Sequence, residues 1–109
     1  MPTLVPAAQP DFELGLRALL VSFGASEVGL DARIRVSVEA SLAALAHSAE
    51  DGRSLHPHEV LRIRTGKFAA AQLPAEVYRD RARLSALRAG IGQLIEAWLG
   101  PPKGSLLGV

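Results

Sequence analysis

The sequence predicts an all-α protein: a small antiparallel bundle of three main helices and one short helix, with extended arms at both ends. Three observations predict this fold. Apolar residues recur every three or four positions over long stretches, as on one face of a helix. Aromatic residues make up only 5% of the chain, which is unusual for a β-sandwich or barrel. Short Gly- and Pro-containing connections favour antiparallel neighbours, and 109 residues support one domain, here over residues 11–100.

The first predicted helix follows an N-terminal arm. Residues 1–10 contain three prolines and no periodicity, so we expect them to be extended. Asp11 is a good N-cap residue, and Gly24 is a good helix stop. Between them, one apolar stripe consists of Phe12, Leu16, Leu19, Leu20 and Phe23. The pattern predicts a helix over residues 11–23.

A second helix is predicted over residues 31–50, with Asp31 as its cap. Its apolar positions advance by three or four residues and cover one face. They are Leu30, Ile34, Val38, Leu42, Leu45 and Ala49.

Residues 33–38 also allow a different interpretation, because polar and apolar side chains alternate there as in a half-buried strand. With the helix-forming segments that follow, this order resembles the ribbon-helix-helix repressors. The resemblance implies a two-chain β-ribbon in the DNA major groove, with Arg33, Arg35 and Ser37 facing base edges. The family usually begins near the ribbon, whereas a hydrophobic helix comes first here. The unbroken periodicity from Leu30 to Ala49 favours the helix.

The third predicted helix is short. His56 and Pro57 begin it, Glu59 lies in its first turn, and Gly66 ends it. Residues 68–72 then form a helix-tolerant connector.

The last predicted helix spans residues 73–100, with Pro74 at its first position and Gly100 as its stop. Its apolar face consists of Val77, Leu84, Leu87, Ile91, Leu94, Ile95 and Trp98. A neighbouring face carries small residues: Ala82, Ala86, Ala89, Gly90 and Ala97. Glycine inside a helix costs about 1 kcal/mol relative to alanine, so we expect another helix to approach closely near Gly90.

The sequence has no catalytic set, more apolar residues than one small core needs, and an arm at each end. These observations suggest a non-enzymatic interaction module, such as a small structural or adaptor subunit that binds a protein partner or a second copy. The tail, residues 101–109, is expected to be flexible and to dock through its apolar side chains. Its Gly104–Gly108 segment resembles the C-terminal loading peptides of encapsulin cargo proteins, which implies docking on a partner. The predicted partner-binding residues are Ala86, Gly90, Trp98, Leu106 and Leu107.

The alternative function is binding of DNA or RNA. Residues 1–51 hold seven acids and three bases, whereas residues 52–109 hold nine bases and four acids. Such asymmetry can indicate a basic partner surface in the second half. The candidate nucleic-acid-binding residues are Arg62, Arg64, Lys67, Arg79 and Arg83. On a helical wheel the cations bracket the apolar stripe, which favours the protein-binding reading.

Enzymatic activity is the third possibility and ranks last. No nucleophile elbow or phosphate-binding loop is present in the sequence, and cysteine is absent. His47, His56 and His58 are possible ligands for zinc or iron, but their spacing matches no common metal motif. We therefore expect no cofactor, metal or small-molecule substrate. The lack of cysteine, of an apolar membrane-spanning stretch and of a signal-peptide pattern predicts a cytoplasmic protein.

Overall fold

The computed structural model describes residues 4–50 and 56–100 of the chain. Over these residues the chain forms helices and no strand, which confirms the predicted all-α class. Four of the five described helices are long, where the sequence predicted three long helices and one short one. They are α1 (Leu4–Ser22), α2 (Leu30–Glu50), α3 (Pro57–Ala71), α4 (Ala75–Tyr78) and α5 (Arg81–Leu99).

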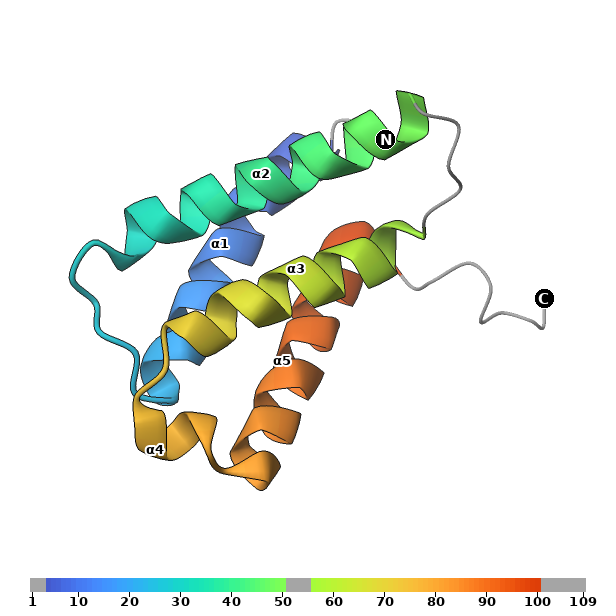
Figure 1. Cartoon of the computed structure of the whole chain (residues 1–109). Coiled ribbons are helices and arrows are strands. Elements are labelled where there is room, and N and C mark those ends of the chain that lie inside the picture. The colour runs from blue at the N-terminus through green and yellow to red at the C-terminus, as the bar shows by residue number, and fades with distance from the viewer. Residues whose placement is uncertain (1–3, 51–55, 101–109) are drawn as a thin grey trace.

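The long helices form two antiparallel pairs that lie in two layers (Figure 1). The α2 and α3 helices form one pair, and α1 and α5 form the other. Between the layers, α1 also contacts α2 and α3 also contacts α5, while the short α4 contacts α5. Each long helix therefore has two long neighbours around one shared core.

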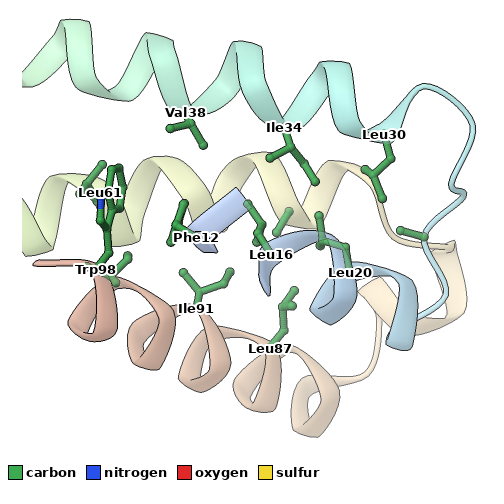
Figure 2. Packing of buried hydrophobic residues seen from close by; sticks show 13 residues of the cluster. Phe12, Leu16, Leu20, Leu30, Ile34, Val38, Leu61, Leu87, Ile91 and Trp98 are labelled. Atoms are coloured by element: carbon green, nitrogen blue, oxygen red, sulfur yellow. The ribbon is translucent and has the colours of Figure 1, made fainter. Parts of the chain in front are cut away.

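That core is built from aliphatic side chains with one aromatic pair at its end (Figure 2). Phe12 of α1 stacks on Trp98 of α5, with ring centroids 4.6 Å apart. The predicted apolar face of the last helix is confirmed, since its members are buried or half-buried. So is the predicted face of α2 from Leu30 to Leu45.

The end of α1 agrees with the sequence prediction. Gly24 has a φ of 101°, and its amide donates to the carbonyl of Val21 at 2.9 Å. The amide of Ala25 donates to the carbonyl of Leu20 at 3.0 Å, which completes a Schellman motif. The predicted glycine stop is therefore confirmed, and Ala25 is buried beside it.

The start of α1 was predicted wrongly. The helix begins at Leu4 and contains Pro10, so residues 4–10 are not extended and Asp11 is not the N-cap. Across Pro10, Gln9 Nε2 donates to Glu13 Oε2 at 3.2 Å, one turn further on. Proline lacks the amide that would bond one turn back, but it does not forbid helical backbone.

Residues 33–38 lie inside α2, so the strand interpretation and the ribbon-helix-helix resemblance are wrong. The burial pattern gives the reason. Ile34 and Val38 are 1% and 4% exposed, whereas Val36 is 66% exposed. A half-buried strand would have placed these three side chains on one face. Helical packing of Ile34 and Val38 against the core leaves Val36 in solvent.

The third helix is longer than predicted and does not end at Gly66. It continues to Ala71, because its buried face runs on past the glycine through Thr65 and Ala69. Both are small residues, so they form a weak hydrophobic pattern in the sequence. His56 precedes the first turn and Pro57 begins it, as predicted.

The predicted single helix over residues 73–100 is two helices. The α4 helix ends at Tyr78, and Asp80 then caps α5 by accepting a hydrogen bond from the amide of Arg83 at 3.2 Å. Pro74 precedes α4 as its N-cap and is not inside it. At the other end, Gly100 has a φ of 86° and ends α5 as predicted.

Candidate binding groove

A continuous stripe of α3 faces away from the core. Its residues recur at intervals of three or four over the whole helix, so they share one helix face. They are Glu59, Arg62, Ile63, Gly66, Lys67, Ala70 and Ala71. At 1.5 Å per residue, the stripe is about 18 Å long.

This stripe forms one wall of a groove with a volume of about 1190 Å³. The opposite wall comes from the first half of α5. Its α5 members are Arg81, Leu84, Leu87, Arg88 and Ile91. The short α4 and the turns around it close one end of the groove with Leu73, Ala75, Tyr78 and Arg79.

The groove has an apolar lining that is open to solvent. Ile63 is 52% exposed and Tyr78 is 56% exposed. Leu84 is half-buried, and Leu87 and Ile91, which also line the groove, are buried members of the core. Exposed apolar side chains that share one concavity are typical of a binding surface, whereas isolated ones are not.

The groove is also basic. Five exposed cations line it, against one carboxylate, that of Glu59. They are Arg62, Lys67, Arg79, Arg81 and Arg88. None of the five forms an ion pair within the described part of the chain. Their side chains therefore present a net positive field over the apolar lining.

Three cations elsewhere in the described helices are paired with carboxylates of the chain. Arg17 bonds Glu27 and Asp31, each at 2.9 Å. Arg35 lies 3.6 Å from Glu13, the partner of Gln9. Arg83 pairs with the capping residue Asp80 at 3.4 Å. These paired cations lie outside the groove, whereas the five groove cations are in no ion pair among the described residues.

Some of the predicted nucleic-acid-binding residues line the groove and others do not. The structure brings Arg62, Lys67 and Arg79 together in the groove. Arg64 is exposed on α3 and Arg83 on α5, but neither lines the groove.

Two groove cations, Arg81 and Arg88, were not predicted as site residues. They are seven residues apart on one flank of α5, and that spacing was visible in the sequence. The sequence did not show that these two cations share a groove with Arg62 and Lys67, because that arrangement depends on α3 packing beside α5.

The predicted partner-binding residues occupy different surroundings. Trp98 is 7% exposed and stacks on Phe12, so its side chain belongs to the core. Gly90 faces α1, where an added Cβ would lie 3.0 Å from two methyl groups of Leu19. This is the close helix approach that the sequence predicted near Gly90. Ala86 is exposed on α5. Leu106 and Leu107 lie outside the described residues.

The histidines do not assemble a metal site in the described residues, where no group of three or more His, Cys, Asp or Glu side chains could hold an ion. The rings of His56 and His58 lie 5.2 Å apart, edge to face. His58 Nε2 donates to the carbonyl of Gly100 at 2.6 Å, which ties the start of α3 to the end of α5. None of the described helices is long and apolar enough to cross a membrane.

Comparison with models of protein families, with curated proteins and with solved structures finds no match for this chain.

Proposed function

We propose that this chain is a non-enzymatic helical interaction module, a small adaptor or structural subunit that binds another protein through the α3–α4–α5 groove. The observation that carries the proposal is the groove itself, which combines exposed apolar side chains with unpaired cations. Protein segments are commonly held in such grooves, with apolar anchors inside and charges at the rim.

The residues of the groove favour binding over catalysis. Among the described residues that line it, no histidine, serine or threonine is present, and the side chains able to transfer a proton are Glu59, Lys67 and Tyr78. General acid–base catalysis needs titratable groups close to the reacting atoms, and nucleophilic catalysis needs an activated side chain. Most of the lining consists of arginines and apolar side chains, which supply affinity and orientation.

Binding of DNA or RNA is the second candidate function. It is favoured by the convergence of five cations, because phosphate contacts supply most of the affinity for nucleic acids. The apolar lining favours a protein ligand instead, since phosphates gain nothing from contact with Ile63 or Leu84.

Two further parts of the proposal are a cytoplasmic location, in keeping with the absence of cysteine, and self-association through the exposed Ala86 face of α5.

Site-specific photocrosslinking in cells tests the proposed function. A photoreactive amino acid replaces Ile63 inside the groove or, as a matched control, Val36, which is exposed on α2 outside it. We expect protein adducts from position 63 that disappear when Arg62→Glu and Arg88→Glu are combined. Position 36 should not give these adducts.

Two results would contradict the proposal. The same adducts from both positions would show that the groove has no special role. Adducts from position 63 that nuclease treatment removes would identify a nucleic acid as the ligand.

A further inference from the structure

We infer that the occupant of this groove is an acidic amphipathic helix of a partner protein, an inference that rests on the proposed protein-binding function. Three features of the described residues carry it: the shape of the α3 stripe, the open space at Gly66, and the charge around the rim.

The shape of the groove fits a helix. Its α3 wall is straight, because it is one face of one helix, and it extends for about 18 Å. Small residues, Gly66, Ala70 and Ala71, lie along the second half of this wall. Small side chains allow two helix backbones to approach closely, while Ile63 and Leu84 provide apolar contacts for the occupant.

Gly66 gives a second, independent indication. An added Cβ at this position would meet no atom within 4 Å. At two other helix-interior glycines the space is filled by leucines of the same chain: Cβ atoms at Gly15 and Gly90 would lie 2.6 and 3.0 Å from Leu94 and Leu19. At Gly92 the nearest atom is Arg62 Cδ, at 3.9 Å. Glycine weakens a helix relative to alanine, so a glycine without a packing partner disfavours α3. A side chain of the occupant that enters this space would explain why a glycine stands at position 66.

The charge of the groove sets the chemistry of the occupant. Five cations against the carboxylate of Glu59 leave a net charge of +4 around the apolar lining. Arg62 and Lys67 lie on the α3 side, and Arg81 and Arg88 lie on the α5 side. A helix in the groove therefore meets cations on both flanks. Complementarity requires Glu or Asp on either side of its apolar stripe.

A peptide selection tests this inference on the full chain. A displayed library of random peptides of about 14 residues, long enough to match the groove as a helix, is selected on the wild-type protein. Peptides that also bind the Gly66→Leu variant are removed. This variant fills the open space of the groove and keeps a residue that favours a helix.

We expect the enriched peptides to carry apolar residues at helical spacing, flanked by Glu or Asp. No enrichment, or enriched peptides without this pattern, would overturn the inference. Continued crosslinking from position 63 in that case would leave the proposed protein-binding function standing, so the two failures are distinguishable.

The affinity of the consensus peptide then identifies the surface. Combined Arg62→Glu and Arg88→Glu substitutions should raise Kd about tenfold or more, because two favourable charge contacts become repulsive. The control Arg64→Glu, on the same helix but outside the groove, should change Kd less than about threefold. Gly66→Leu should also raise Kd about tenfold or more, with a melting temperature no lower than wild type.

Competing occupants give different results in the same assays. Mixed-sequence oligonucleotides that bind more tightly than the peptide, and are unaffected by Gly66→Leu, would overturn the inference in favour of a nucleic acid. Dimers of the protein alone that Gly66→Leu converts to monomers would place a second copy in the groove and overturn it as well. An equal effect of Arg64→Glu and of the groove substitutions would show that the peptide binds outside the groove.

Discussion

The glycines within the helices differ in how much space surrounds them, and the sequence does not show this difference. At Gly90 the missing side chain is replaced by Leu19 of α1, so the glycine permits a close helix contact. At Gly66 nothing replaces it. The sequence predicted a close approach at Gly90 and a helix end at Gly66. The first prediction was right and the second was wrong, because the packing of α3 on the core outweighs the low helix propensity of one glycine.

This contrast gives a prediction for the free protein. Gly66→Ala should raise the free energy of unfolding by about 0.5–1 kcal/mol, since the added methyl group enters open space and alanine favours the helix. Gly90→Ala should be less stable than Gly66→Ala, because both methyl groups of Leu19 must move. Urea unfolding followed by circular dichroism measures both values. Equal gains at the two positions would contradict the packing described at Gly90.

Among the elements, the ends of the helices were the hardest features to predict. Pro10 suggested an arm where α1 is already helical, and Asp80 was read as a residue within one long helix. Asp80 follows a turn with favourable helix formers on both sides, so local propensity does not reveal the break. The start of α5 at this point is fixed by the side chain of Asp80, which accepts a hydrogen bond from the amide of Arg83. That hydrogen bond cannot be recognised in the sequence alone.

The cap of α5 can be tested directly. Asp80→Ala removes the hydrogen bond to the Arg83 amide and the ion pair with its side chain, so we expect a loss of about 0.5–2 kcal/mol in unfolding free energy. Glu76→Ala is the matched control, because Glu76 is exposed in the first turn of α4 and is in no ion pair within the described residues. Its effect should stay within about 0.5 kcal/mol. Chemical denaturation measures both, and a similar loss for the two variants would argue against the cap.

At the scale of the whole molecule, the core could be predicted far better than the groove. The α2 and α5 helices bury the faces that their own periodicity indicates, as Ile34 and Ile91 show, whereas α3 buries Thr65 and Ala69 and exposes Ile63. The groove depends on which helices become neighbours. Arg62 and Arg88 are separated by most of α3, all of α4 and part of α5, and no local pattern links them. The helical wheel of α5 alone placed its cations on the two flanks of a packing face, but packing against α3 makes one of these flanks a wall of the groove.

Because four helices share one core, the molecule should unfold as a single cooperative unit. Trp98 is the only tryptophan, and it is buried on Phe12, so its fluorescence reports on the α1–α5 contact while circular dichroism reports on all helices. Leu16 is 0% exposed at the centre of α1, and Leu14, two residues earlier, is 66% exposed. Leu16→Ala should lower the free energy of unfolding by about 2–5 kcal/mol by both measurements, and Leu14→Ala by less than about 0.5 kcal/mol. Separate transitions for fluorescence and circular dichroism would show that α1 and α5 fold apart from the α2–α3 pair.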